Sequence, residues 1–370
     1  MYDYDVIIVG AGVGGAHLSR RLRSSGARIL MLEREKDVKV DSGIVSRDVL
    51  KYIRIPKRVV REKISEMVFV SPRGKEVSLA TKKYFALLID SAKFRRWLRR
   101  EAERYCELRF ETCKYVSVKK EFVEVSTDKS TYVAKLVVAC DGAVSRVRSA
   151  LGLTPPKIFS SARCRVKRNR HRRITVYFNK NYSPHFFAWE IPKSREIGLI
   201  CRDWIGEHLN LFVKENGFEV KEKTFAPVAI GAVKSYARRC VLLGDACGQT
   251  KPFTAGGIVY AIRCAEIAGA VIKRLLSENR FDERSLAVYE KRWKREIGFE
   301  ISLQMFLRNL YRRMSNNDIE KMFALLGREI ERIRELEYDR ISSLLRNLPK
   351  RKLLKALALL LPVMLARCYY

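Results

Sequence analysis

A glycine-rich turn near the start of the chain has the residue types that hold a diphosphate. Gly10, Gly12 and Gly15 are spaced GxGxxG directly after the apolar run 5–9. The first glycine permits a tight turn, the second lets backbone N–H groups approach a pyrophosphate, and the third lets the following helix pack closely on the sheet. Glu33 stands 23 residues after Gly10 and can accept hydrogen bonds from ribose hydroxyls. The pattern predicts a dinucleotide site that favours FAD or NAD over NADP.

Two later apolar runs end in acidic residues. The run 136–140 is followed by Asp141 and Gly142, and the run 241–243 is followed by a glycine and Asp245. Short apolar runs of this kind are typical of buried parallel strands. A carboxylate at the end of such a strand is suited to a ribitol or ribose hydroxyl.

Gly256, Gly257 and Ile258 then begin a segment whose pattern predicts a helix to Leu276. The N-terminus of a helix carries positive potential, so it can face an anion. In a flavoprotein this anion would be the N1–O2 edge of the reduced ring. The two halves of the site, in this order and more than two hundred residues apart, predict that one chain wraps one FAD.

These motifs resemble those of the flavoprotein group that contains aromatic hydroxylases, flavin halogenases and geranylgeranyl reductases. The stretch 244–258 is most similar to archaeal geranylgeranyl reductases, and the stretch 187–192 (FAWEIP) resembles the YxWxFP signature of that family. The resemblance covers most of residues 1–300. It implies an FAD-dependent reductase of isoprenoid C=C double bonds, acting on geranylgeranyl chains of archaeal-type membrane lipids by hydride transfer from reduced flavin.

The same stretch 187–192 also resembles the WxWxIP signature of halogenases. A flavin-dependent monooxygenase or halogenase that acts on an apolar substrate is therefore the alternative. The chain has no second GxGxxG motif, so we expect electrons from a transiently bound NAD(P)H or from a ferredoxin-like protein.

The resemblance also implies roles for individual residues. Val116 would present its backbone near the adenine, and Ser42 with Gly43 would lie in the loop that passes the isoalloxazine ring. The implied cofactor contacts are Gly10, Gly12, Gly14, Gly15, Glu33, Ser42, Gly43, Val116, Asp141, Gly142, Asp245, Gly256, Gly257 and Ile258. Gly12, Gly14 and Gly15 would line the pyrophosphate, and Gly257 and Ile258 would lie at the ring.

Three residues are expected at the substrate: Phe187, Trp189 and Pro192. Phe187 and Trp189 are two apart, so in a strand both would face one side. They would wall an apolar tunnel over the flavin, although by spacing alone they fit an ordinary sheet core.

Two positions depart from the family pattern. Asp41 stands where the family often has a cysteine, and it is the one residue that we name as a candidate proton donor. Ser91 stands where the family often has an arginine, and Lys93 or Arg95 would supply the missing charge.

The predicted fold class is α/β. The segments 1–60, 91–155 and 236–285 are expected to form a discontinuous Rossmann-like FAD-binding domain of the glutathione-reductase-like type, in its aromatic-hydroxylase subgroup. Alternating short runs in 61–90 and 156–235 predict an inserted, largely antiparallel substrate-binding sheet. Helical periodicity predicts a helical region over 286–370.

The charge is strongly unbalanced, with 74 Lys and Arg against 41 Asp and Glu, a net charge of +33. We expect an anionic partner such as phospholipid headgroups, or an acidic electron donor. The abundance of charge with only two glutamines is also typical of a thermophile. Nucleic acid is not expected, because no RNA-binding motif with interleaved aromatic residues is found. Seven Lys or Arg in 163–173 predict either a solvated face or a docking patch for phosphates.

The longest apolar stretch, 353–366, follows the basic segment 350–352 and is too short to span a bilayer. It predicts either an interfacial helix or a core helix that closes the domain. Nine cysteines without a CxxC pair, and four scattered histidines, predict a reducing compartment and no metal site. We expect a cytoplasmic protein, with peripheral attachment to the cytoplasmic membrane face as a further expectation.

Overall fold

The apolar runs that predicted buried strands form a parallel sheet. The computed structural model of the chain describes residues 2–365. In this structure β1 (Tyr4–Val9) lies between β2 (Ile29–Glu33) and β11 (Thr131–Ala139) and pairs in parallel with both. The further strands of this sheet are β8 (Glu107–Phe110), β9 (Cys113–Val118), β10 (Val123–Thr127), β17 (Tyr236–Ala237) and β18 (Cys240–Leu242). The main path runs β17-β18-β11-β1-β2-β8, and β10 and β9 join antiparallel at β11.

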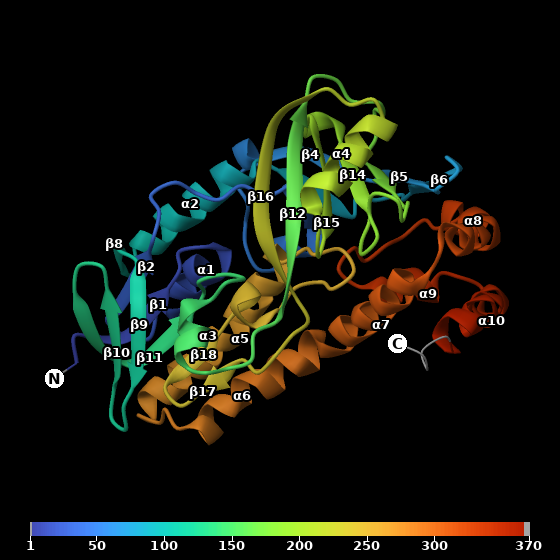
Figure 1. Cartoon of the computed structure of the whole chain (residues 1–370). Helices are drawn as coiled ribbons and strands as arrows, with labels where there is room; N and C mark the ends of the chain where they lie inside the picture. The colour runs from blue at the N-terminus through green and yellow to red at the C-terminus, as the bar shows by residue number, and fades with distance from the viewer. Residues whose placement is uncertain (1, 366–370) are drawn as a thin grey trace.

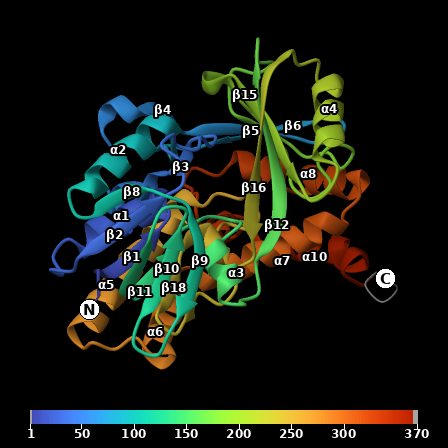
Figure 2. The ribbon, with the colours of Figure 1, turned by 60° about the vertical axis from the view of Figure 1, so that its left-hand side comes forward.

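Two hydrophobic cores cover the two faces of this sheet. Val6 and Ile8 of β1 point into one core, while Ile7 and Val9 point into the other. Helices cover the first face: α1 (Val13–Leu22), α2 (Ser91–Glu103), α5 (Ile258–Ser277) and α6 (Glu283–Trp293). The strands β9 and β10, with the short helix α3 (Arg146–Ala150), cover the second face, as Figure 2 shows.

A second sheet of seven strands stands beside the first domain (Figure 1). Its strands are β5 (Glu66–Val70), β6 (Glu76–Ala80), β12 (Lys157–Val166), β13 (Thr175–Tyr177), β14 (Ala188–Ile191), β15 (Glu196–Cys201) and β16 (Val220–Ile230). The order is β16-β12-β15-β14-β13-β5-β6, and every pair is antiparallel except β13 with β5. The helix α4 (Ile205–Glu215) packs on its outer face. The predicted α/β fold with an inserted, largely antiparallel sheet is confirmed.

The segment 61–90 does not join the second sheet as one piece, which corrects the predicted domain boundary. Its outer strands β4 (Val60–Ile64) and β7 (Ala86–Ile89) instead form a separate three-stranded sheet with β3 (Ile44–Ser46), in which β7 lies in the middle and pairs with both β3 and β4. The reason lies in β7, whose four residues are all apolar and all buried. Leu87 and Ile89 pack in the core of the first domain, whereas Ala86 and Leu88 pack in a core beneath the second sheet. A strand that is apolar on both faces can pack against both cores, so it lies at the junction of the first domain and the second sheet.

The C-terminal region is helical, as predicted. The helix α6 continues through a π-helical turn (Lys294–Gly298) into α7 (Phe299–Arg313), and the two run from below the first domain to beneath the second sheet (Figures 1 and 2). The remaining helices are α8 (Asn316–Glu331), α9 (Ile341–Arg346) and α10 (Lys350–Leu365). A buried ion pair of 2.9 Å between Lys251 and Asp339 joins this region to the loop before α5.

The helix α10 has a buried face, as expected of a core helix, and an outer face with exposed leucines, as expected of an interfacial helix. Ala356 and Leu360 are buried against the body of the protein, whereas Leu354 (67% exposed), Leu357 (49%) and Leu361 (51%) face outward. Ala366, the end of the stretch, lies outside the described residues. No helix within residues 2–365 is long and apolar enough to cross a membrane.

Candidate functional site

The glycine-rich turn leads from β1 into α1, and its glycines have different surroundings. Gly10 has φ +105°, and a Cβ there would lie 2.3 Å from the carbonyl oxygen of Cys140. A Cβ at Gly15 would lie 2.1 Å from the carbonyl oxygen of Gly10, and one at Gly14 would lie 2.4 Å from Leu243 Cδ2. A Cβ at Gly12 would meet no atom within 4 Å. Gly10, Gly14 and Gly15 therefore serve close packing, and Gly12 is the glycine that leaves room beside the turn.

Two helices begin at this edge of the sheet without a capping side chain. The N-caps are Gly12 for α1 and Gly257 for α5, and no side chain of the described residues bonds to the first N–H groups of either helix. In contrast, Asp90, Asp282 and Ser315 cap α2, α6 and α8. The first N–H groups of a helix need an acceptor, and an anion can provide it. Two open N-termini at one edge are suited to a ligand with separate negative groups.

The predicted acidic residues stand at the ends of their strands. Glu33 ends β2, and its Oε2 accepts a hydrogen bond of 2.9 Å from the N–H of Ala11. Asp141 follows β11, and its Oδ2 accepts from the N–H of Val147 at 3.2 Å. Its Oδ1 is buried and has no hydrogen-bond partner within residues 2–365. Burial raises the pKa of Asp141, although hydrogen bonds from Ser145 and Val147 oppose the shift. The free Oδ1 is suited to a hydroxyl donor.

Gly142 and Val116 are two further residues that we predicted at the cofactor. Gly142 has φ +85° and open space beside it. Val116 lies in β9 with its side chain buried, and its position pairs with Val125 of β10. Its role near an adenine stays a prediction.

The second half of the predicted flavin site, in the stretch 244–258, meets the first half at the N-terminus of α5. A Cβ at Gly257 would lie 3.1 Å from Asp245 Oδ1, so the carboxylate lies against the start of the helix. A Cβ at Gly256 would lie 2.6 Å from Lys251 Cε. Burial raises the pKa of Asp245, with the nearby Asp41 carboxylate adding to the shift and Arg95 opposing it. Residues from three distant segments therefore lie within electrostatic reach of one another.

Asp41 is paired with Arg95, one of the two residues that we predicted as a source of the missing charge. The distance from Arg95 Nη2 to Asp41 Oδ2 is 2.5 Å, and Gly43 N donates to Asp41 Oδ1 at 2.9 Å. Burial alone raises the pKa of Asp41, but Arg95 and these hydrogen bonds outweigh it, so the pKa lies below its ordinary value. Asp41 is therefore an anion at neutral pH. This argues against its predicted role as proton donor and gives it a role in fixing the loop.

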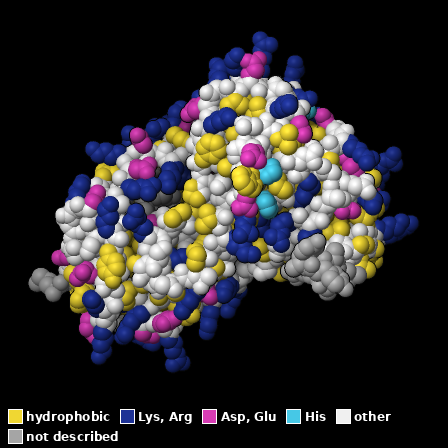
Figure 3. Space-filling model, viewed as in Figure 1, with side chains coloured by type: hydrophobic (Ala, Val, Ile, Leu, Met, Phe, Trp, Pro, Cys, Tyr) yellow, Lys and Arg dark blue, Asp and Glu magenta, His cyan; other side chains and the backbone are white. Residues whose placement is uncertain are grey.

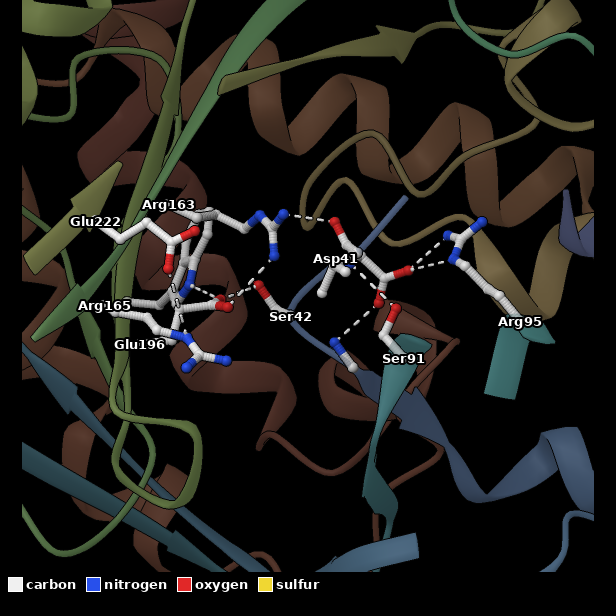
Figure 4. A network of polar contacts seen from close by, with 11 residues as sticks. Asp41, Ser42, Ser91, Arg95, Arg163, Arg165, Glu196 and Glu222 are labelled. Atoms are coloured by element: carbon white, nitrogen blue, oxygen red, sulfur yellow. Dashed lines mark hydrogen bonds and ion pairs between the residues drawn. The ribbon is translucent and has the colours of Figure 1, made fainter. Parts of the chain in front are cut away.

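The loop 40–43 is held from its other side by the second sheet, as Figure 4 shows. Ser42 Oγ donates to Glu196 of β15, and Trp189 Nε1 of β14 donates to the same oxygen, Glu196 Oε1, at 3.2 Å. Arg163 of β12 lies 3.4 Å from Glu196 Oε2 and also donates to the carbonyl oxygen of Val40. The Glu196 carboxylate thus connects the loop, the tryptophan and an arginine.

Some of these residues could not be predicted in their observed roles. Glu196 belongs to a strand with no functional motif, Asp339 lies in the region without one, and Arg163 was predicted only as a member of the basic run 163–173. Gln249 and Lys251 stand inside the stretch 244–258, where a polar residue between small ones is a usable signal. The side chain of Gln249 accepts from the N–H of Gly244 at 2.8 Å and fixes the turn after β18.

The predicted substrate residues divide between two places. Phe187 lies in a group of aromatic rings, 5.8 Å from Phe178 and 6.3 Å from Phe253. Trp189 packs between two apolar clusters and covers Gly198. Pro192 lines a separate cavity of about 540 Å³ whose other walls include Lys63, His171, Arg172 and Lys193. The aromatic group is suited to an apolar chain, and the cavity at Pro192 is not.

The comparison with known proteins bears on the first half of the chain. Residues 3–167 match the family of the FAD binding domain. The cofactor of this protein is FAD. The residues present fit it: two uncapped helix N-termini can face the diphosphate and the ring, and Gly12 leaves room for the former. Glu33, Asp141 and Asp245 supply acceptors for hydroxyl groups.

Other comparisons found similar proteins that align with nearly the whole chain. The digeranylgeranylglycerophospholipid reductase of Methanocaldococcus jannaschii is 28% identical over 363 residues, which cover 89% of this chain and 92% of that protein. A geranylgeranyl bacteriochlorophyll reductase-like protein of Thermoplasma acidophilum superposes with a TM-score of 0.85 at 18% identity, covering 97% of this chain and 99% of the other. The p-nitrophenol 4-monooxygenase PnpA of Pseudomonas putida superposes with a TM-score of 0.67 at 18% identity, covering 88% and 94%. The two superpositions show the fold alone, and together with the relative they confirm the predicted resemblance.

Gly12 offers a test of the diphosphate site that separates binding from folding. We expect Gly12→Ala to leave the thermal unfolding midpoint of the FAD-free protein nearly unchanged, because a Cβ there meets no atom. FAD affinity should fall at least tenfold, about 1.4 kcal/mol, because the new methyl group lies where the diphosphate approaches. Gly15→Ala is the control and should instead lower the midpoint, since its Cβ meets Gly10. Titration of the apoprotein with FAD, followed by flavin fluorescence, measures the affinity; equal Kd values for Gly12→Ala and wild type would contradict this placement.

Glu196→Gln tests the connection between loop and sheet. The pair with Arg163 is largely buried, with 12% of each side chain exposed, so removing one charge should destabilise the protein by about 3 kcal/mol. Trypsin should also cut faster after the exposed Lys39, because the adjoining loop loses its anchor. Glu222→Gln on the same sheet is the matched control, since its pair with Arg165 is exposed and should change stability by less than about 0.5 kcal/mol. Similar urea midpoints and cleavage rates in the two variants would argue against this role.

Proposed function

We propose that this protein is an FAD-dependent reductase of isoprenoid C=C double bonds, acting on geranylgeranyl chains of archaeal-type membrane lipids. The similarity to digeranylgeranylglycerophospholipid reductases over 89% of the chain supports this activity. The structural observation that carries it is the aromatic group between the loop before α5 and the second sheet. An isoprenoid chain is apolar over its whole length and needs such a surface.

Four rings of this group come from three different parts of the chain. Phe253 belongs to the loop that precedes α5, and its ring lies 6.3 Å from Phe187 and 6.2 Å from Tyr311 of α7. Phe178 lies 5.8 Å from both Phe187 and Tyr311. Rings from the cofactor domain, the sheet and the C-terminal region therefore meet beside the loop where the ring end of FAD is expected. Large aromatic side chains supply apolar contact area and exclude water.

In this proposal the protein holds the substrate in position and excludes water from the site. Bound FAD would supply, in its reduced form, the hydride for one alkene carbon, and the other carbon would take a proton from water or a nearby acid. An isolated alkene is not polarised, so the residues must hold it close and keep water away. The open N-terminus of α5 presents N–H groups to negative charge at the ring end of the site, which favours reduction. The Asp41–Arg95 and Glu196–Arg163 pairs fix the loop that passes the site.

A flavin-dependent monooxygenase or halogenase is less well supported. Solved enzymes of these kinds share the fold, with TM-scores of 0.67 and 0.66 against 0.85 for the reductase-like protein. Several relatives that align over most of the chain are named digeranylgeranylglycerophospholipid reductases. Electrons are expected from NAD(P)H or from a ferredoxin-like protein, and the net charge of +33 suits an acidic donor.

We infer further that the protein attaches peripherally to an anionic membrane through α10. The three exposed leucines Leu354, Leu357 and Leu361 recur at helical spacing on its outer face, and Lys350, Arg351 and Lys355 are exposed on the same helix. Cations at headgroup level with leucines below them are the pattern of an interfacial helix. The basic run 163–173 is less suited to this task, because Arg163, Arg165, Lys167 and Arg173 already have acidic partners.

An anaerobic turnover experiment tests the activity. Photoreduced protein mixed with geranylgeranyl phospholipid should recover the oxidised flavin spectrum, and the lipid should gain two hydrogens per reduced bond by mass spectrometry. Phe187→Ser should lower kcat/KM at least tenfold, because burying the ring contributes about 1.5–3 kcal/mol, while bound FAD is retained. Phe225→Ser, on an exposed site of β16, is the control. Product that forms only with oxygen, in step with its consumption, would favour the monooxygenase instead.

Membrane attachment is tested with vesicles that contain an anionic lipid. The triple variant Leu354→Gln, Leu357→Gln and Leu361→Gln should bind at least tenfold more weakly, since each buried leucine contributes about 1 kcal/mol or more. The matched control is Val144→Gln, an exposed apolar residue of the first domain. Sedimentation at low and at physiological salt measures binding. Equal partition of the triple variant and the wild type would remove α10 as the attachment surface.

A further inference from the structure

The buried face of α7 carries polar atoms that the protein itself does not satisfy. Gln304, Arg308 and Tyr311 follow one another at spacings of four and three, so they lie on one face of the helix. All three are buried, and Arg308 is only 3% exposed. Within residues 2–365, Gln304 Oε1, Arg308 Nε and Nη2, and the Tyr311 hydroxyl have no hydrogen-bond partner. Such atoms are rare in proteins, and a row of them on one helix needs a physical reason.

Arg308 lies against two aromatic rings, Phe159 of β12 and Phe186, which precedes β14. Its guanidinium is 4.3 Å from the centre of the Phe159 ring and 4.5 Å from that of Phe186. Cation–π contacts do not use the N–H donors, so Nε and Nη2 are left for another acceptor. Burial, and then Arg312, lowers the pKa of Arg308 to about 10, so the side chain is still charged at neutral pH.

The surrounding charges are positive. Burial, and then Arg312 and Arg308, lowers the pKa of Lys180 to about 8. Burial, and then Lys180 and Arg308, lowers the pKa of His185 to about 4, so the imidazole is neutral. The carboxylate that opposes this shift, Asp203, lies 4.0 Å from Arg202. On the side of the molecule seen in Figure 3, histidine side chains lie beside Asp and Glu side chains and above a group of Lys and Arg side chains.

The C-terminal end of α7 provides hydrogen-bond acceptors for Lys180 but not for Arg308. Lys180 Nζ donates to the carbonyl oxygens of Tyr311 and Arg312 at 3.1 and 3.3 Å, which caps the negative end of the helix. Arg308 makes no such bond within the described residues, and its charge adds to that of Lys180. A buried cation without an anion is costly. An anionic ligand would remove this cost.

The cations adjoin the aromatic group of the proposed substrate site. The Tyr311 ring, one turn from Arg308 on α7, lies 5.8 Å from Phe178 and 6.2 Å from Phe253. One helix thus carries an apolar contact and a cation on the same buried face. This juxtaposition matches a molecule with an apolar chain and a negatively charged head.

We propose that Arg308 binds the phosphate of a prenyl phospholipid substrate, with Arg312 and Lys180 adding to the positive potential. The proposal rests on the proposed reductase function. A guanidinium can donate two parallel hydrogen bonds to phosphate oxygens, which a single ammonium cannot. The free Nε and Nη2 lie on one edge of the group and suit this contact. The Tyr311 hydroxyl can donate to the same head group.

The test compares two ligands that differ only in the phosphate, geranylgeranyl phosphate and geranylgeraniol. Isothermal titration of the oxidised, FAD-loaded protein should show tighter binding of the phosphate than of the alcohol. Arg308→Met keeps the apolar stem and should weaken phosphate binding at least thirtyfold, with the alcohol changed less than twofold. Arg295→Met, an exposed arginine of the same helical stretch, is the matched control and should change neither. Thermal unfolding should show that each variant is folded.

Turnover separates this proposal from the proposed function. If both hold, Arg308→Met raises KM for geranylgeranyl phosphate and leaves kcat/KM for the alcohol unchanged. Equal loss for both ligands, or no loss, would overturn the phosphate site while the reductase activity stands. A wild-type protein that binds the phosphate selectively but reduces neither compound would overturn the function and keep the site. Inorganic phosphate that competes as strongly as the prenyl phosphate would show a site for free phosphate and overturn the lipid assignment.

Discussion

Two helices that start at the same edge of one parallel sheet, both without a capping side chain, are the feature on which the rest of the structure depends. α1 begins at Gly12 and α5 at Gly257, so the chain must bring together segments that are 245 residues apart. The two helices lie against each other, and His17 Nε2 lies 2.6 Å from Glu266 Oε1 across the contact. Open N–H groups at both helices need acceptors, and an anion is well suited to provide them. FAD, with a diphosphate and a ring that becomes negative on reduction, meets this requirement.

The loop 40–43 shows how the second sheet depends on the first domain. It lies between Arg95 of α2 and Glu196 of β15. Its ion pair with Arg95 is partly exposed, whereas the Glu196–Arg163 pair on its other side is largely buried. Asp41 is kept ionised by Arg95, so the loop carries a fixed negative charge on one side. On the other side, Glu196 holds Ser42 and Trp189 with one oxygen. The position of the sheet, and of the aromatic residues on it, therefore follows from the position of the cofactor domain.

The sequence predicted those features that local physics determines. The GxGxxG turn, Glu33 at the end of β2 and the helix from Ile258 depend on short-range geometry and could be predicted from spacing. The separate three-stranded sheet could not, because the apolar run 86–89 fits several sheets equally and only its pairing with β3 decides. Glu196 and Asp339 are single acidic residues without a motif, and their partners Arg163 and Lys251 lie 33 and 88 residues away. A contact between residues so far apart leaves no recognisable pattern in the sequence around either residue.

The C-terminal region had no motif, yet it completes the substrate side of the site. Asp339 neutralises Lys251 in a fully buried setting, and Lys251 lies against the glycines that begin α5. Without this carboxylate, a buried ammonium would stand beside the ring end of the FAD site without a counter-charge. α7 adds Tyr311 to the aromatic group and continues from α6, which packs on the cofactor domain. The region is thus a structural part of the proposed reaction site, and its polar residues must be judged by what they contribute there. This is why an unsatisfied arginine on α7 has a different meaning from an exposed one elsewhere on so basic a protein.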